Sequence, residues 1–443
     1  MPRSVLWFRI IVLGFILGLF LFQKHINMSK ISEYWVGREV QIEGIVMRNP
    51  VEIEDKKYLA VKPICEDSQN NQNKLKDLIL ISVNFYQDIQ NGDKILFSGK
   101  LEENNYNPFD VFLNNKLVYT IYNGKVKILE PANHKNLFYI WRNSIISKIK
   151  GMFLPRESFL ASMILVGKSG GYNKEIDNMF RQAGLSHILV VSGLHLTMFT
   201  DILNYLVYML PVGLVFSSLV NLIFILFFIL LIGFTGSLLR AGIMVLLHII
   251  GKTNHRVYNI TNALLLSSFI ILVFNPQTLF VDLGFQLSFL SVLCLIYISP
   301  IIGDMLTLHF PDEKWKSIIL TVSVALSIFI GMTPFLIYKT NSISLISPLA
   351  NLIVVPLIAP LLCLLIVGVF LNFIWSSLFW FVNIIISGYL KFVLFLVNIF
   401  ASVKYANYPI GGLSLIVMCM YYFILIVFLI KYYRKHLYLT ISF

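Results

Sequence analysis

The chain has 443 residues, of which 57% are hydrophobic and 13% are charged, and its formal net charge is +12. A soluble domain averages about 25% charged residues, so this composition excludes an ordinary soluble protein and indicates an integral membrane protein. Of the four cysteines only Cys65 lies outside an apolar run, so the sequence predicts no disulfide within the soluble part and no Cys/His zinc site.

The chain begins with a predicted membrane anchor. Arg3 and Arg9 precede an uncharged run over 10–22, and no small residues follow it at the spacing of a cleavage site. A basic flank and an apolar run without a cleavage site are typical of a signal-anchor helix that is not removed. We therefore expect residues 1–23 to be an N-terminal transmembrane anchor.

Residues 24–135 form a soluble-looking segment with equal numbers of basic and acidic residues. Strand-like runs alternate there with turn signals such as Asn91-Gly92 and Asn123-Gly124, a pattern typical of a small sandwich or barrel. We therefore expect a small N-terminal β domain. The runs that predict strands are 40–46, 58–62, 78–83, 94–97 and 125–129.

Residues 136–183 lead from this domain to the apolar part of the chain. Within them, 137–153 carry apolar and basic positions at helical spacing, which is typical of a helix lying on a membrane surface. The turn 167–171 reads GKSGG but lacks the upstream glycine of a phosphate-binding loop. We expect 136–183 to be an amphipathic membrane-surface and re-entrant segment.

Nine apolar spans follow from residue 184, and a transmembrane helix needs roughly 20 apolar residues. With the N-terminal anchor the sequence predicts a polytopic α-helical membrane protein with about ten transmembrane helices. The span 343–372 is long and contains three prolines, so we expect it to be broken. The nine spans are 184–209, 212–233, 236–251, 257–275, 283–300, 317–338, 343–372, 375–400 and 411–430.

Basic clusters predict the orientation of these helices. The clusters at 252–256 and 431–435 fall on the same side of the membrane as Arg3 and Arg9. The positive-inside rule makes that side the cytoplasm. Both termini, including a tail over 432–443, are therefore expected in the cytoplasm of a bacterial cell, and the β domain is expected outside it.

The first candidate motif is GLSHILVVSGLHLTMF at 184–199. On a helix, His187 and His195 would lie about 80° apart, and Ser192 and His195 would be surface neighbours around Gly193. Small and hydroxyl residues are common between membrane helices, so packing alone is one interpretation. Two ionisable side chains at membrane depth favour the other, a polar patch that lines an aqueous path.

The second motif, GFTGSLLRAGIMV at 233–245, places Arg240 inside a short span. An arginine at the centre of a membrane costs about 2.5–3.5 kcal/mol on insertion scales. The residue therefore needs a partner or water, unless it lies shallow and extends to the surface.

The third motif, NPQTLFVDLGFQLSFLSVL at 275–293, puts Asp282 and Gln286 on one face at a helix start. Asp282 either favours the N-terminus of that helix or pairs with Arg240.

The fourth motif lies at 333–360, where Asn351 stands among prolines. Irregular backbone at membrane depth is tolerated when it is buried in protein or lines a cavity, so Asn351 is a candidate polar liner; a plain proline kink is the alternative.

Catalytic chemistry finds little support in the sequence. The membrane part has no His-x-His, no HExxH and no acidic cluster, so we expect no metal centre, no cofactor and no catalytic residue. An intramembrane hydrolase based on Ser192 and His195 would need a base aimed at the hydroxyl, usually from another helix. Such a hydrolase is one alternative, and a transporter of a smaller anion is another.

The four motifs, in this order, resemble the membrane core of the ComEC family, the inner-membrane DNA channel of bacterial natural competence. The resemblance covers about 155–430 and rests on the GLSH and SGLH elements, the arginine of LLRAGIM, DLGFQLSF and PLANLIVVPL. Members have an outward domain with an OB-like fold where this chain has its β domain. The resemblance implies a channel core at 184–431.

The function implied by this resemblance is movement of single-stranded DNA into the cytoplasm. A polyanion needs donors along its path, and the site residues carried over to that role are His187, Ser192, Gly193, His195, Arg240, Asp282, Gln286 and Asn351. No Asp or Glu follows Glu313, which fits an anion path. The implied partners are single-stranded DNA, membrane lipid, a DNA receptor, a cytoplasmic motor ATPase and further copies of the chain.

One departure from the family is expected. Many members continue into a C-terminal metallo-β-lactamase-like domain thought to degrade the strand that is not transported. No motif of that type occurs in this sequence. A nuclease role is therefore not carried over, and the chain is not expected to be an enzyme.

Overall fold

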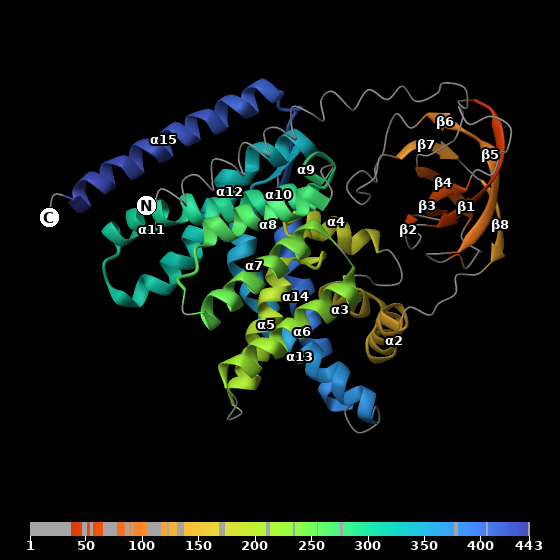
Figure 1. Ribbon diagram of the computed structural model, residues 1–443, viewed down its shortest axis with the longest axis horizontal. Coiled ribbons are helices and arrows are strands. Elements are labelled where there is room, and N and C mark those ends of the chain that lie inside the picture. Colours follow the sequence, from red (N-terminus) through yellow and green to blue (C-terminus); the bar gives the residue numbers. More distant parts are fainter. Residues whose placement is uncertain are drawn as a thin grey trace.

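The computed structural model describes most of the chain outside its first 36 residues (Figure 1). The predicted anchor at 1–23 lies outside the described residues. The described ranges are 37–46, 51–53, 56–64, 78–84, 89, 93–103, 117–121, 124–130, 137–167, 173–209, 213–233, 235–254, 256–274, 278–375, 380–404 and 406–441.

The N-terminal part forms one eight-stranded sheet in the order β6-β7-β4-β3-β1-β5-β8, with β2 paired to β3. Its pairs are antiparallel except β4 with β7. The strands are β1 (Glu39–Val46), β2 (Val51–Ile53), β3 (Lys56–Ile64), β4 (Leu78–Asn84), β5 (Lys94–Lys100), β6 (Glu102–Glu103), β7 (Leu117–Ile121) and β8 (Lys125–Glu130).

One face of this sheet is packed with apolar side chains. Ile95 and Phe97 of β5 are fully buried, as are Leu59, Ile79 and Ile81 of the neighbouring strands, so side chains at alternate positions build a core. The five predicted strands are all present. The sequence missed β2 and β6, which are very short, and β7, whose parallel pairing with β4 is a long-range contact.

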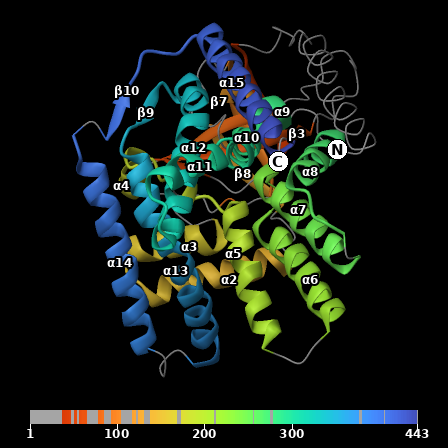
Figure 2. The same ribbon diagram turned by 90° about the vertical axis from the view of Figure 1, so that its left-hand side faces the viewer.

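The rest of the chain is helical (Figures 1 and 2). The helices are α2 (Leu137–Met152), α3 (Pro155–Val166), α4 (Lys174–Gln182), the 3-10 turn η2 (Ser186–Ile188), α5 (Gly193–Tyr208), α6 (Leu214–Ile232), α7 (Gly236–Thr253), α8 (Ile260–Phe274), α9 (Thr278–Val281), α10 (Leu283–Tyr297), α11 (Ser299–His309), η3 (Glu313–Trp315), α12 (Lys316–Thr340), α13 (Ser347–Trp375), α14 (Trp380–Ser402) and α15 (Leu415–Ile441). β9 (Ser342–Ser344) precedes α13 and β10 (Asn407–Pro409) precedes α15, and the two strands pair in an antiparallel two-stranded sheet.

Six stretches of the described chain are long and apolar enough to cross a membrane, and α6 and α8 add two shorter apolar helices. The six are Gly236–Thr253, Leu283–His309, Glu313–Thr340, Ser347–Trp375, Trp380–Ser402 and Leu415–Arg434. The structure thus shows a mostly helical membrane protein with a small N-terminal sheet region. The total of about ten transmembrane helices stays a prediction.

The predicted break in the span 343–372 is wrong, because α13 runs unbroken for 29 residues. Pro348 lies in its first turn, where no helical N–H is needed. Pro356 and Pro360 lie inside the helix, and their spacing of one turn puts the disturbance that they cause on one face. The opposite face can then keep its helical hydrogen bonds.

The main helical core joins elements that are far apart in sequence. Fully buried side chains from α2, α3, α4, α13 and α14 pack in one cluster, among them Ile149, Leu160, Phe180, Leu365 and Leu390. Figure 2 shows α14 on one side of the helical part and α6 and α7 on the other, with α5 and α13 between them. This arrangement brings the start of α5 into the interior.

α15 runs along the outside of the helical part and contacts α12, a helix with an internal proline (Figure 1). Pro334 lies inside α12 and has no N–H to donate to the carbonyl of Ile330. The Tyr421 hydroxyl donates to this carbonyl at 3.0 Å, and the Tyr422 hydroxyl donates to that of Gly331 at 2.9 Å. α15 therefore satisfies the backbone group that the proline leaves unpaired.

The Tyr421→Phe variant should lose about 1 kcal/mol of stability, the contribution of a typical hydrogen bond. Thermal unfolding in detergent checks this. In a Pro334→Ala background the restored backbone N–H can bond Ile330 itself, so the same substitution should have little effect there. Equal losses in both backgrounds would contradict this account of the kink.

Candidate functional site

The segment that precedes α5 is not part of an α-helix and contains the short 3-10 turn η2, which corrects the predicted span 184–209. The helix begins at Gly193, and Ser192 is its N-cap. The Ser192 hydroxyl accepts a hydrogen bond from the backbone N–H of Leu194 at 3.3 Å. Serine is a preferred N-cap because its side chain satisfies a helical N–H that has no backbone partner. Ser192 and His195 are therefore a cap and its third helical residue, not neighbours on a helix surface.

His195 is 1% exposed and folds back over the cap. Its Nδ1 accepts from the backbone N–H of Ser192 at 3.3 Å and lies 3.3 Å from the Ser192 hydroxyl. In a neutral imidazole with Nδ1 accepting, the proton is on Nε2. This Nε2 is buried and has no hydrogen-bond partner among the described residues. The side chain thus holds a buried donor without a described acceptor.

His187 lies in η2 and not on α5, so the prediction that the two histidines lie on one helix is wrong. Its side chain is exposed. His187 also interacts electrostatically with His195, so the structure does bring the two imidazoles near one another.

Gly193 forms the close contact between α5 and α7. A methyl group on Gly193 would lie 2.8 Å from Cβ of Ala241 and 3.0 Å from Nη2 of Arg240. Small residues allow helix backbones to approach closely inside membranes. The first and second sequence motifs therefore meet here, with the guanidinium against the first turn of α5.

Arg240 is 8% exposed, so it does not extend to the surface. Its Nε donates to the Ser288 hydroxyl on α10 at 2.9 Å, and its Nη1 contacts the Met244 sulfur at 3.2 Å. No Asp or Glu in the described part of the chain forms an ion pair with it. The structure therefore holds a buried cation with a hydroxyl and a thioether as its described partners.

Asp282 caps helices and does not pair with Arg240. Its Oδ1 accepts from the backbone N–H of Phe285 at 3.1 Å, which makes it the N-cap of α10. Its other oxygen lies against Gly236, the first residue of α7, where a methyl group would come within 2.5 Å of it. A carboxylate near two helix N-termini is stabilised by both helix dipoles. Of the two predicted roles, the structure shows the cap.

Gln286 and Asn351 make local contacts at two further places. The Gln286 amide donates to the carbonyl of Leu279 at 2.7 Å and so ties α10 to α9. The Asn351 amide donates to the backbone carbonyl of Ser347 at 2.8 Å and to its hydroxyl at 3.0 Å. Gln286 is thus a link between neighbouring helices, and Asn351 lies in the first turns of α13.

Ser347 connects Asn351 to the start of the first motif. Its hydroxyl donates to the carbonyl of Gly184 at 3.4 Å, and the Ser344 hydroxyl donates to the carbonyl of Gln182 at 3.0 Å. Gly184 has φ +71°, and a methyl group on it would lie 2.6 Å from Cβ of Ser347. Only glycine fits this position without strain. The first and fourth motifs are therefore in direct contact.

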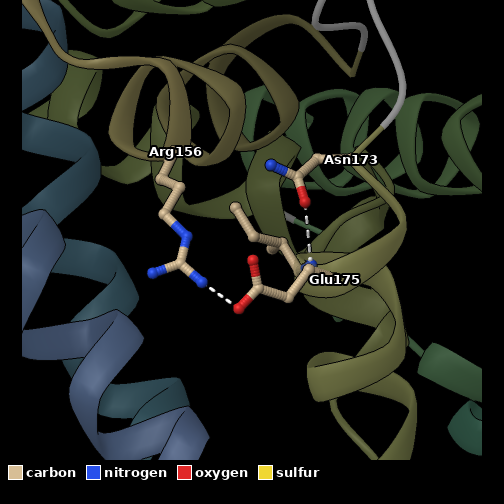
Figure 3. Close-up of polar contacts among 4 residues, drawn as sticks. Arg156, Asn173 and Glu175 are labelled. Carbon is tan, nitrogen blue, oxygen red and sulfur yellow. Dashed lines mark hydrogen bonds and ion pairs between the residues drawn. The ribbon is translucent and has the colours of Figure 1, made fainter.

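Polar contacts position α4, the helix that precedes the first motif (Figure 3). Asn173 caps α4 by accepting from the backbone N–H of Ile176 at 3.1 Å, and Arg156 of α3 pairs with Glu175. Both charged side chains of the pair are exposed. Exposed ion pairs contribute about 0.2–1 kcal/mol, so this pair adds little to the stability of the fold. Its main effect is to orient α4 against α3.

Two contacts of the candidate site were not predicted from the sequence. Ser288 belongs to the third motif but was not singled out, although a hydroxyl in an apolar run is a visible signal. Ser347 had no such signal, because its partner Gly184 is distant in sequence. Within the described residues no group of three or more His, Cys, Asp or Glu could hold a metal ion.

Much of the chain is similar to known competence proteins. Residues 164–435, more than half of the chain, match the Competence protein family. The chain is 32% identical over 228 residues to ComE operon protein 3 of Bacillus subtilis (strain 168), an alignment that covers 51% of this chain and 28% of that protein. No solved structure gives a significant match. All four motifs lie within 164–435, and the chain belongs to the ComEC family of competence proteins.

Proposed function

We propose that this protein is an inner-membrane channel that moves single-stranded DNA into the cytoplasm during natural transformation. Membership of a competence family supports a role in DNA uptake. The chain spans 28% of the length of the curated relative, so the activity is inferred from this chain's own site and not from that protein as a whole.

The observation that carries the proposal is the environment of Arg240. A buried guanidinium without a carboxylate partner is costly at membrane depth, and an anionic ligand would offset that cost. Its Nη2 lies against the first turn of α5, where the helix dipole also favours negative charge. A DNA phosphate supplies one negative charge and several acceptors to such a place.

Hydrogen-bond donors near Arg240 extend the proposed DNA path. In this proposal the buried Nε2–H of His195, which has no described partner, donates to a phosphate or base acceptor, and the exposed side chain of His187 adds to the path. Asn351 is joined to the same region through Ser347 and Gly184. In this proposal Ser192 and Gly193 shape the site, while Asp282 and Gln286 position α10 and hence Ser288.

The remaining parts of the proposal concern topology and partners. The core at 184–431 forms the channel, the sheet region within 24–135 is an OB-like domain outside the cell, and both termini are cytoplasmic. A cytoplasmic motor ATPase would supply energy. A DNA receptor would deliver the strand, and several copies of the chain could assemble.

The direct test is uptake of labelled DNA into a nuclease-protected pool. Cells without the gene should take up none, and the wild-type gene should restore uptake. The His195→Leu variant should reduce uptake about tenfold, since it removes a buried hydrogen-bond donor from the path.

His309→Leu is the matched control, because His309 is exposed at the end of α11 and should retain wild-type uptake. Wild-type uptake by His195→Leu, with the protein present in the membrane, would contradict the assignment. Transport of inorganic phosphate without DNA uptake would favour a transporter of smaller anions instead.

A further inference from the structure

A polar pocket lies away from the candidate channel site, between α2, α13 and α14. It has a volume of about 430 Å³, within the range of roughly 300–1,000 Å³ typical of ligand pockets. Its principal lining side chains are Ser144, Ser147 and Lys148 of α2, Asn372 and Phe373 of α13, and Asn383 of α14. Among the described residues that line it, Lys148 is charged and none is Asp or Glu.

Two hydrogen-bonded amide side chains, those of Asn372 and Asn383, form the back of the pocket. Asn372 is 2% exposed; its amide donates to the carbonyl of Gly368 at 2.8 Å and to Oδ1 of Asn383 at 2.8 Å. Asn383 donates in return to Oδ1 of Asn372 at 3.1 Å. This leaves the second N–H of Asn383 for a further acceptor. Buried amides are costly inside a membrane protein unless their hydrogen bonds are made, so an acceptor ligand would complete this pair.

The front of the pocket carries the charge. The Lys148 ammonium lies 5.7 Å from the centre of the Phe373 ring, which holds it beside the amide pair. Ser144 lies one turn before Lys148 on α2 and Ser147 directly precedes it, and both hydroxyls line the pocket and add two donors. One cation, two hydroxyls and an amide N–H match a group with one negative charge and several acceptor oxygens. A phosphate diester has this chemistry.

The surroundings place the pocket at the boundary between lipid and water. Trp375 and Trp380 end α13 and begin α14, and each is 62% exposed. Exposed tryptophans are enriched at the level of lipid headgroups. On α2, the exposed side chains of Leu137, Ile140 and Trp141 precede the polar residues of the pocket. A ligand here would therefore meet water on one side and lipid on the other.

We propose that this pocket binds the phosphate headgroup of an anionic phospholipid and so anchors α2 to α13 and α14. The acyl chains lie along the exposed apolar faces of the latter two helices, where Phe370, Phe381 and Ile385 offer lipid contacts. Lys148 provides the charge that distinguishes an anionic lipid from a zwitterionic one. This site is independent of the DNA path.

The test is lipid retention by the purified full-length protein in native mass spectrometry, with dioleoyl phosphatidylglycerol and dioleoyl phosphatidylcholine as probes. The wild type should retain the anionic lipid at least about tenfold more than the zwitterionic one. Lys148→Gln should reduce that retention about tenfold, the effect of losing one charge-assisted hydrogen bond. Lys150→Gln is the matched control, since Lys150 lies on the same helix outside the pocket and should behave as wild type.

A second variant separates binding from folding. Asn383→Leu should also lose the anionic lipid, and thermal unfolding without added lipid reports whether the variant remains folded. Equal retention of the two lipids by the wild type, or equal loss in Lys148→Gln and Lys150→Gln, would overturn the proposal. Competition by inorganic phosphate at the affinity of the lipid would also overturn it, because it would make the site one for free phosphate.

Discussion

The Arg240→Gln variant is expected to reduce DNA uptake at least about tenfold while its amount in the membrane stays unchanged. The substitution removes the buried charge that would meet a DNA phosphate. A hydrogen bond to a charged group contributes about 1.5–3 kcal/mol, and 1.4 kcal/mol corresponds to a tenfold change. The measurement is nuclease-protected uptake in cells without the chromosomal gene, with membrane levels determined in parallel.

Stability distinguishes this loss from simple misfolding. Arg240 is buried and has no ion-pair partner in the described part of the chain, so replacing it with a neutral side chain relieves a desolvation cost. The melting temperature of Arg240→Gln in detergent should therefore equal or exceed that of the wild type. A variant that melts earlier and takes up DNA normally when present would contradict the proposed role.

Two further arginine variants sharpen the result. Arg240→Lys keeps the charge but loses the planar donor set that reaches Ser288, so it should retain part of the uptake. Arg156→Gln removes an exposed arginine from its pair with Glu175 and should change uptake less than about twofold. Equal defects in Arg240→Lys and Arg240→Gln would assign the role to geometry and not to charge.

The Gly193→Ala variant should be destabilised by about 1–3 kcal/mol, the cost of overpacking a tight interface. Its new methyl group would lie 2.8 Å from Cβ of Ala241, and both carbons are fixed to helix backbones. α5 and α7 must then separate, which also displaces Arg240 from the first turn of α5. Thermal unfolding and DNA uptake should therefore fall together.

Gly388→Ala provides the matched control for this prediction. Gly388 lies inside α14, and a methyl group there would have no neighbour within 4 Å. Alanine in place of glycine inside a helix is favourable by roughly 0.5–1 kcal/mol, so this variant should be slightly more stable than the wild type. The same melting temperature for both alanine variants would show that the contact at Gly193 is not tight.

Several features of the site followed from local sequence, because they depend on residues close together in the chain. Asp282 precedes an apolar run as an N-cap should, and the structure confirms it in that place. The strand-like runs of the N-terminal region are strands, since alternation of side chains is a local property. The helix that begins at Gly193 was misjudged by nine residues, because Ser192 had been taken as part of an apolar span and not as its cap.

By itself the sequence determined that the protein is a membrane protein, which motifs it carries and to which family it belongs, because composition and motif order are properties of the chain alone. Only the tertiary structure decided which motifs meet. Contacts such as Gly193 with Arg240, Ser347 with Gly184, and Tyr421 with the carbonyl that Pro334 leaves unpaired join distant segments. Such contacts depend on how whole helices pack, and periodicity within one helix specifies the face that it buries but not the partner that it meets.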